Sequence, residues 1–152
     1  MPGKVINWIA LADDDVDDRD VFTEVCKDLD PRLHVMLYND GKELLDYLNS
    51  PKARIPVILF LDINMPFKNG FESLEEIRSN PKLKSICIIM YSTSSSPSDI
   101  AKAKKLGAEG FFQKPSNYGK LKSTLRKLLD IDWTNPCSEF DDLNFLVDTS
   151  HT

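Results

Sequence analysis

Five short apolar runs divide the chain, and turn residues bound each of them. The runs occupy residues 7–12, 33–38, 57–61, 86–91 and 110–113. Continuous apolar runs of this length are typical of strands that are buried on both faces, as in a parallel sheet. The second run also contains His34 and Tyr38, so we expect that strand at an edge of the sheet.

Between and after these runs, apolar residues recur at helical spacing and predict five helices. The expected buried positions are Val21, Phe22, Val25, Cys26 and Leu29, then Leu44, Leu45 and Leu48, then Phe71, Leu74 and Ile77, then Ile100, Ala103 and Leu106, and finally Leu121, Thr124, Leu125, Leu128 and Leu129. In the first helix, Asp17, Asp18 and Asp20 are expected on the opposite face.

Strands that alternate with helices predict a parallel sheet that is covered by helices on both faces and joined by right-handed crossovers. The expected fold is therefore α/β. It is a doubly wound five-stranded parallel sheet with flavodoxin-like (βα)5 topology and strand order 2-1-3-4-5. That order places the first and third strands side by side.

Four of the five predicted strands end in polar residues. These residues are Asp13 and Asp14, then Asp62, then Ser92 and Thr93, and finally Lys114. In a parallel sheet the carboxyl ends of the strands open on one edge, where ligands of such folds bind. An aspartate at a strand end can also simply start a turn, and for Asp62 alone the two interpretations are evenly matched. Four polar strand ends with this charge pattern favour a shared pocket.

The chemistry expected of this pocket follows from three carboxylates, a hydroxyl and an ammonium group. Clustered carboxylates repel one another unless a cation lies among them. Oxygen ligands suit Mg²⁺, and a backbone carbonyl near Asn64 can supply a further oxygen. Metal, lysine and hydroxyl together are what a phosphoryl group requires. An aspartate held there can attack a phosphoryl donor and become an acyl phosphate.

Composition narrows the class of protein. The 152 residues carry a formal net charge of -5, which argues against a general affinity for nucleic acid. No apolar run approaches the roughly 18 residues of a membrane span, and the first residues lack the features of a signal peptide, so a cytoplasmic location is expected. Three cysteines are too few for a disulfide framework or a zinc site, and Cys26 and Cys87 are expected to be small buried hydrophobes.

From about Val5 to about Asp130, the chain resembles the receiver domain of bacterial two-component response regulators of the stand-alone type. The motifs that carry the resemblance match the family in order and spacing. They are Asp13-Asp14, Asp62 in Leu-Asp-Ile-Asn-Met-Pro, Ser92-Thr93, Gly107-Ala-Glu-Gly-Phe-Phe and Lys114-Pro115.

The resemblance implies a role for each of these residues. Asp62 would be the phosphoacceptor. Asp14, Asp62 and the Asn64 carbonyl would bind Mg²⁺, and Asp13 would join through water. Ser92 and Lys114 would hold the phosphoryl oxygens.

Three further features belong to the same comparison. Thr93 stands where the family usually has Ala or Gly, which narrows access to the phosphoacceptor. Phe111 would be the switch aromatic, although it lacks the hydroxyl of a tyrosine. The Lys114-Pro115 peptide would be cis.

The function that the resemblance implies is a phosphorylation-dependent signalling switch in a two-component system or phosphorelay. A histidine kinase or a histidine phosphotransfer protein would donate the phosphoryl group. Phosphorylation would then change binding to an unknown downstream protein, with no direct contact with nucleic acid or a membrane. Such a protein catalyses only its own phosphorylation and dephosphorylation.

Three other functions can be weighed against the residues. A second aspartate two residues after the nucleophile, acting as a general acid and base, would favour an Mg²⁺-dependent phosphatase or phosphotransferase. This chain has Asn64 at that position. A flavodoxin-like FMN carrier needs a phosphate-cradling loop after the first strand, where this chain has a run of repelling aspartates. A degenerate receiver that works without phosphorylation is disfavoured, because every required group is present.

The expected division of the chain is a receiver domain over residues 1–131 and a tail over residues 132–152. The tail is too short for a DNA-binding module, so no output domain is expected. Asp132 and Trp133 are expected to cap the last helix. Two interpretations of the remaining tail stay open: a short amphipathic segment, built on Phe140, Leu143, Phe145, Leu146 and Val147 with Asp141 and Asp142, or a frayed end.

Overall fold

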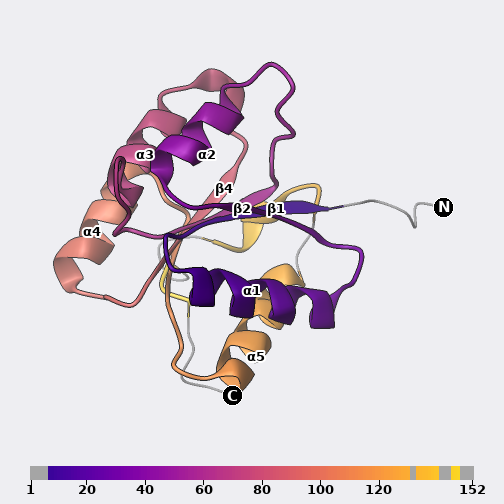
Figure 1. Ribbon diagram of the computed structural model, residues 1–152. Helices are drawn as coiled ribbons and strands as arrows, with labels where there is room; N and C mark the ends of the chain where they lie inside the picture. The colour runs from indigo at the N-terminus through magenta and orange to yellow at the C-terminus, as the bar shows by residue number, and fades with distance from the viewer. Residues whose placement is uncertain (1–6, 131–132, 141–144, 148–152) are drawn as a thin grey trace.

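The computed structural model describes residues 7–130, 133–140 and 145–147 (Figure 1). Strands and helices alternate along the chain. They are β1 (Trp8–Ala12), α1 (Val16–Leu29), β2 (His34–Tyr38), α2 (Gly41–Leu48), β3 (Ile58–Leu61), α3 (Gly70–Arg78), the short 3₁₀ helix η1 (Pro81–Leu83), β4 (Cys87–Ser92), α4 (Pro97–Leu106), β5 (Gly110–Gln113), α5 (Tyr118–Leu129) and a second 3₁₀ helix, η2 (Pro136–Glu139). Within the described residues, no helix combines the length and apolar character needed to cross a bilayer.

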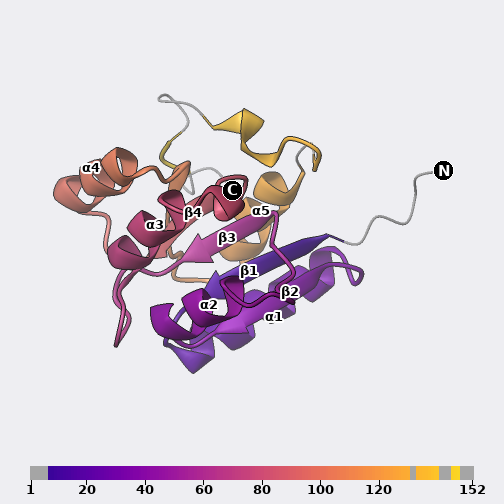
Figure 2. The same ribbon diagram turned by 90° about the horizontal axis from the view of Figure 1, so that it is seen from above.

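The five strands form one parallel sheet in the order β2-β1-β3-β4-β5, which confirms the predicted fold (Figure 2). The strand that contains His34 lies at the edge, as its polar residues indicated. Ala12 and Leu61, the last residues of β1 and β3, lie opposite each other, and Leu61 is opposite Met90, two residues before the end of β4. The residues that follow these strands therefore emerge at one edge of the sheet.

Helices cover both faces of the sheet, with α2, α3 and α4 on one side and α1 and α5 on the other (Figure 1). Alternate side chains of each strand enter opposite cores, because side chains in a strand alternate between its two faces. Leu59 and Met90 belong to the core under α2, α3 and α4, while Phe60 and Tyr91 belong to the core under α1 and α5. All four are almost fully buried.

The expected buried face of α1 needs one correction. Phe22, Val25 and Cys26 are buried as predicted, but Val21 is 38% exposed. Each residue of a helix is turned about 100° from the one before it. Val21 therefore falls beside the apolar stripe rather than on it.

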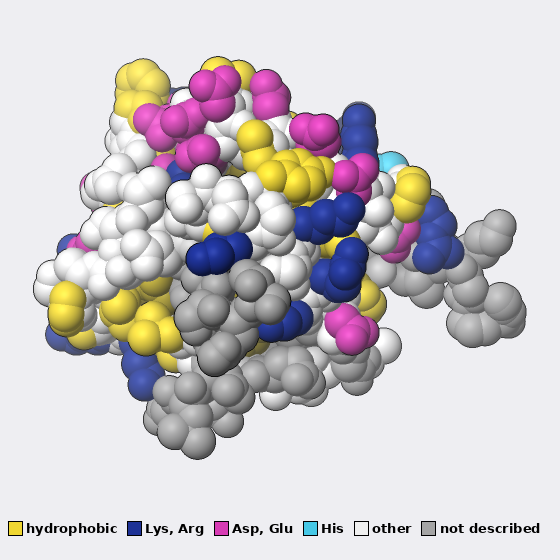
Figure 3. Space-filling model, turned by 90° about the horizontal axis from the view of Figure 1, so that it is seen from below, with side chains coloured by type: hydrophobic (Ala, Val, Ile, Leu, Met, Phe, Trp, Pro, Cys, Tyr) yellow, Lys and Arg dark blue, Asp and Glu magenta, His cyan; other side chains and the backbone are white. Residues whose placement is uncertain are grey.

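The paired helices α1 and α5 carry opposite charges on their outer surfaces. Acidic side chains gather over α1 and basic side chains over α5 (Figure 3). Lys122 of α5 lies 3.7 Å from Asp28 of α1 at this junction. The charge pattern adds to the apolar packing that brings these two helices together.

The described part of the tail packs on the domain. Leu146 forms a parallel bridge with Phe111 on the outer side of β5. The Phe111 N–H donates to the Phe145 carbonyl over 2.8 Å, and the Val147 N–H donates to the Phe111 carbonyl over 2.9 Å. Phe145 is only 5% exposed. A frayed end is therefore wrong for residues 145–147, which pair with an otherwise open edge of the sheet.

Two other expectations for the tail concern the cap of α5 and the amphipathic segment. The C-cap of α5 is Asp130, so the predicted cap by Asp132 and Trp133 is wrong; Trp133 instead packs partly buried against the core under α1 and α5. The amphipathic segment is tested only in part. Asp132, Asp141, Asp142 and Leu143 lie outside the described residues.

Candidate functional site

Three carboxylates meet where β1 and β3 end. Asp13 and Asp14 follow β1, Asp62 follows β3, and one carboxylate oxygen of each lies within 4.8 Å of the others. The two strands are neighbours, and the Asp62 N–H donates to the Ala12 carbonyl over 3.0 Å. Asp13 is fully buried and Asp62 is 6% exposed, whereas Asp14 is exposed. The cluster is thus buried on one side and open on the other.

The loop between β3 and α3 turns closely over Asp62. A Cβ atom on Gly70 would lie 2.2 Å from the Asp62 carbonyl oxygen, so this position requires glycine. The Asn64 N–H donates weakly, over 3.4 Å, to Asp62 Oδ1. The same loop holds Phe67 at a positive φ of 68°, with its side chain 84% exposed.

Lys114 reaches the carboxylates from the end of β5. Its Nζ lies 2.7 Å from Asp13 Oδ2, 2.8 Å from Asp18 Oδ2 and 3.6 Å from Asp62 Oδ2. The side chain is 8% exposed. Burial alone would lower the pKa of Lys114, but the adjacent carboxylates outweigh burial and raise this pKa above its ordinary range. Lys114 therefore remains an ammonium group within the cluster.

Asp18 is a site residue that the sequence prediction placed wrongly. Asp18 was expected on the solvent face of α1, yet it binds Lys114 inside the pocket. It precedes the buried Phe22 by one helical turn, so helical spacing puts both on the inner face. That spacing is the signal that could have identified it. Asp15, by contrast, is the N-cap of α1 and accepts hydrogen bonds from the Asp17 and Asp18 N–H groups.

The negative charge of the cluster is only partly neutralised by Lys114, which favours binding of a further cation. Burial, together with the negative charge of Asp13, raises the pKa of Asp62 to about 7, and Lys114 only partly opposes this rise. Asp13 Oδ1 accepts a hydrogen bond from the Asp15 N–H. Asp13 Oδ2 is buried without any hydrogen bond and faces only the Lys114 ammonium as an ion pair. An incompletely satisfied group of oxygen ligands fits a hard divalent cation.

The hydroxyl residues lie at the end of β4, the neighbour of β3: Ser92 is its last residue and Thr93 follows it. Ser92 is fully buried, and its Oγ accepts a hydrogen bond from the Ser94 N–H over 3.2 Å. The Lys114 N–H donates to the Ser92 carbonyl over 2.8 Å, which fixes the end of β5 beside the end of β4. Thr93 is exposed at the rim, and its carbonyl accepts a hydrogen bond from the Gln113 side chain.

Two expectations from the resemblance concern β5 and the turn after it. Phe111 is 1% exposed and lies in the core under α2, α3 and α4. The expected cis peptide between Lys114 and Pro115 is wrong, since the described part of the chain contains no cis peptide bond. The trans form is the one that X–Pro bonds generally favour, by about 0.5–1 kcal/mol.

Comparison with known sequences places this arrangement among related proteins. A family model described as the response regulator receiver domain matches residues 9–126. The chain is 35% identical over 108 residues to stress response regulator protein 1 of Meyerozyma guilliermondii, covering 71% of this chain and 49% of that protein. It is 31% identical over 123 residues to response regulator Rcp1 of Synechocystis sp., covering 76% of this chain and 80% of that protein. The chain thus spans about half the length of the yeast relative.

Solved structures give the same result. The phosphorylated cyanobacterial phytochrome response regulator RcpA superposes with a TM-score of 0.76 at 29% identity, covering 82% of this chain and 91% of that one. The Mn²⁺-bound form of response regulator Rcp1 gives 0.73 at 26% identity, with 80% and 91% covered. The chain therefore belongs to the response regulator receiver domain family, which acts in phosphorylation-dependent signalling.

Proposed function

We propose that this protein accepts a phosphoryl group from a phosphohistidine donor onto Asp62, with Mg²⁺ bound beside it. The contact of Asp62 with two further carboxylates and with Lys114 carries this proposal. Asp62 is a carboxylate beside a fixed positive charge, and attack on phosphorus needs such a nucleophile and such a charge.

The residues for the metal are those of the acidic cluster. Asp14 and Asp62 would bind Mg²⁺ directly, the Asn64 backbone carbonyl would add a further oxygen, and Asp13 would contact it through water. When bound there, Mg²⁺ would supply positive charge that neutralises phosphoryl oxygens. This assignment is supported by Asp13 Oδ2, which is buried without a hydrogen bond, and by the Mn²⁺-bound relative.

The transfer itself forms one bond and breaks one. A carboxylate oxygen of Asp62 attacks phosphorus, and the bond from phosphorus to the donor imidazole nitrogen breaks, which leaves an aspartyl phosphate. Lys114 lies 3.6 Å from Asp62 Oδ2 and is near enough to bind an added phosphoryl oxygen. Ser92 is proposed to hold another oxygen, and Thr93 at the rim is proposed to limit the access of water.

The response is proposed to pass through Ser92 to Phe111. A phosphoryl group adds roughly -1.5 to -2 charge, and Ser92 can move to donate to one of its oxygens. Ser92 ends the strand next to β5, and Phe111 is buried beside Met90 of that strand. The phosphoryl group need only bias an existing equilibrium between two arrangements of this region.

The partners follow from this chemistry. The donor is proposed to be a histidine kinase or a histidine phosphotransfer protein in the cytoplasm, and the target another protein rather than nucleic acid or a membrane. The protein is proposed to act catalytically only on itself. The receiver domain is proposed to cover residues 1–131 and a C-terminal tail residues 132–152, in line with the family match to residues 9–126.

The decisive test is Asp62→Asn. Incubation with acetyl phosphate and Mg²⁺ should add the mass of one phosphoryl group to the wild-type protein, in a base-labile form. Asp62→Asn should stay unmodified, because an amide does not attack phosphorus. The matched control Asp20→Asn changes an exposed acid of α1 and should be modified like the wild type. Full modification of the Asp62→Asn protein would show that the phosphoacceptor lies elsewhere.

A further inference from the structure

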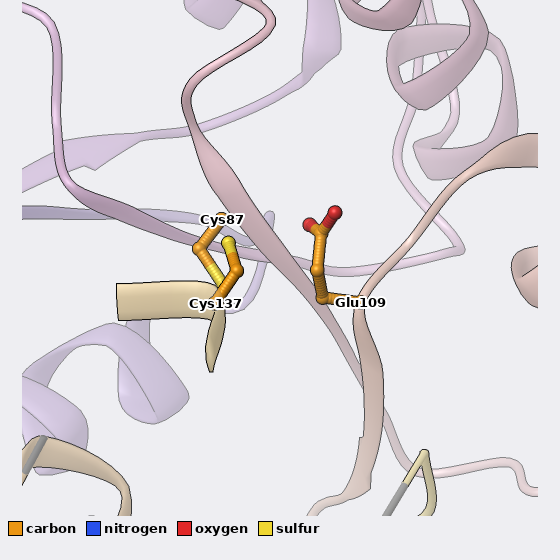
Figure 4. A group of neighbouring side chains, drawn as sticks. All are labelled: Cys87, Glu109 and Cys137. Atoms are coloured by element: carbon orange, nitrogen blue, oxygen red, sulfur yellow. The ribbon is translucent and has the colours of Figure 1, made fainter. Parts of the chain in front are cut away.

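A second group of side chains lies far from the carboxylate cluster. Cys87 begins β4, Glu109 precedes β5, Cys137 lies in η2, and one sulfur or oxygen atom of each lies within 4.8 Å of the others. All three cysteines of the chain are free thiols in this structure. Figure 4 shows the Cys87 and Cys137 side chains beside each other, with the Glu109 side chain to one side of them.

The Glu109 carboxylate already has its partners. Its Oε1 accepts a hydrogen bond from the Ile88 N–H over 2.7 Å and forms an ion pair with Arg78. The Arg78 guanidinium also donates to the Gly107 carbonyl. This fixed positive charge opposes binding of a metal cation next to the two sulfur atoms, because like charges repel strongly where water is scarce.

The sulfur atoms of Cys87 and Cys137 lie within 4.8 Å of each other. Cys87 is fully buried, and a hydrogen bond with the Cys137 side chain, followed by burial, raises its pKa well above the ordinary range. Cys137 is partly exposed, so a solvent-borne reagent can reach it first. The pair thus combines an accessible sulfur with a protected one next to it.

We propose that Cys87 and Cys137 form a reversible disulfide, with hydrogen peroxide or another two-electron oxidant of that class as the co-reactant. The Cys137 thiolate attacks one peroxide oxygen, the O–O bond breaks, and hydroxide leaves and becomes water. The sulfur of Cys87 then attacks the sulfenic acid. The S–S bond forms as the S–O bond breaks, and the leaving hydroxide takes the Cys87 S–H proton and departs as the second water. Two thiols are oxidised by two electrons, and one peroxide is reduced to two waters.

The bond would tie the tail to the sheet. Cys137 packs against the same core as Trp133 and Phe140, and the ring of Phe140 closely covers Gly110 of β5. Phe145, eight residues after Cys137 in the sequence, pairs with Phe111. Oxidation would therefore hold the tail on the outer side of β5, and reduction would leave it held by packing and hydrogen bonds alone.

The test is thiol mapping of the folded wild-type chain. The protein is treated with hydrogen peroxide, denatured, labelled with N-ethylmaleimide and digested without reductant. The expected product is a peptide pair joined through Cys87 and Cys137, with both labels lost together and both restored by dithiothreitol. Cys26, a buried thiol on α1 outside this group, is the internal control and should stay labelled.

A variant separates the disulfide from other products. In Cys137→Ser, which removes the partly exposed thiol, Cys87 should remain fully labelled after peroxide treatment. The proposal is overturned if wild-type Cys87 stays free while Cys137 becomes a sulfinic acid, or if the only disulfide joins two chains. It is equally overturned if peroxide fails to join the thiols while Zn²⁺ alone protects both from labelling, because the group would then be a metal centre.

The same samples give a structural readout. Hydrogen exchange at the Phe111 and Val147 amides, which pair across the β5 edge, should be slower in the oxidised than in the reduced protein. Cys137→Ser should show no such difference on peroxide treatment. Faster exchange on oxidation would contradict a bond that holds the tail in place.

Discussion

The two groups of ligand-type side chains lie at opposite ends of the same parallel sheet, and they differ in how their charges are satisfied. Asp13, Asp14 and Asp62 follow the ends of strands, whereas Cys87 and Glu109 lie at the starts of β4 and β5. In the acidic group, Lys114 is the one cation among the described residues that bridges Asp13 and Asp62. In the other group, the single carboxylate has both an arginine and a backbone N–H.

This difference shows that the proximity of ligand atoms does not by itself define a metal site. Around Asp62 negative charge exceeds positive charge, one buried oxygen lacks a hydrogen bond, and the pKa of Asp62 is raised. A divalent cation would relieve this excess. Around Glu109 the guanidinium of Arg78 already occupies that role. The comparison supports the proposal of metal binding for the acidic group and of thiol chemistry for the other.

The largest effect on stability is expected from Arg78→Met, which removes the cation that pairs with Glu109. Arg78 and Glu109 are 18% and 27% exposed, so loss of the guanidinium leaves a largely buried carboxylate without its cation. The free energy of unfolding should fall by about 3 kcal/mol, at the lower end of the cost of breaking a buried ion pair. Urea denaturation measures this change.

A matched control for that variant is Lys42→Met. It breaks the exposed pair between Lys42 and Asp46, in which both side chains are 67% exposed. Its cost should be far smaller than that of Arg78→Met, because exposed ion pairs contribute little to stability. Equal losses in the two variants would contradict the view that Arg78 satisfies a buried charge.

A slightly smaller effect on stability is expected when Mg²⁺ binds to the acidic cluster of Asp13, Asp14 and Asp62. Mg²⁺ at about 100 times its dissociation constant should raise the free energy of unfolding by about 2.7 kcal/mol, because it binds only the folded state. Asp14→Ala should remove most of this gain, since it deletes one exposed ligand and leaves the buried Asp13 in place. Thermal unfolding with and without Mg²⁺ measures both. If the melting temperature of the wild type were the same with and without Mg²⁺, the metal site would be wrongly assigned.

The smallest effect is expected from Asp15→Ala, which tests whether Asp15 takes part in metal binding. Asp15→Ala removes the N-cap of α1 and should cost about 1 kcal/mol in urea denaturation. The stabilisation by Mg²⁺ should be unchanged, because Asp15 serves the helix. Asp20→Ala, an exposed change on the same helix, should cost much less. If Asp15→Ala abolished the response to Mg²⁺, Asp15 would belong to the acidic cluster.

Local pattern was sufficient to predict the fold and most of the cluster. Apolar runs and helical spacing are properties of neighbouring residues, and they indicated the alternation that leads to a doubly wound sheet. Polar residues at strand ends indicated that Asp13, Asp14, Asp62 and Lys114 would meet, and the structure brings them together. The direct roles of Ser92, Thr93, Asn64 and Phe111 remain predictions.

Only the tertiary structure decided which distant residues become partners. Lys114 binds Asp18 across 96 positions of the sequence, the tail pairs with Phe111, and Cys137 lies beside Cys87. Spacing along the chain determines which residues share a face of one element. It does not determine how far a long side chain reaches from the end of one strand, or which open edge a tail will cover. Those contacts depend on the packing of whole elements, in which buried apolar area and charge are balanced over the entire domain.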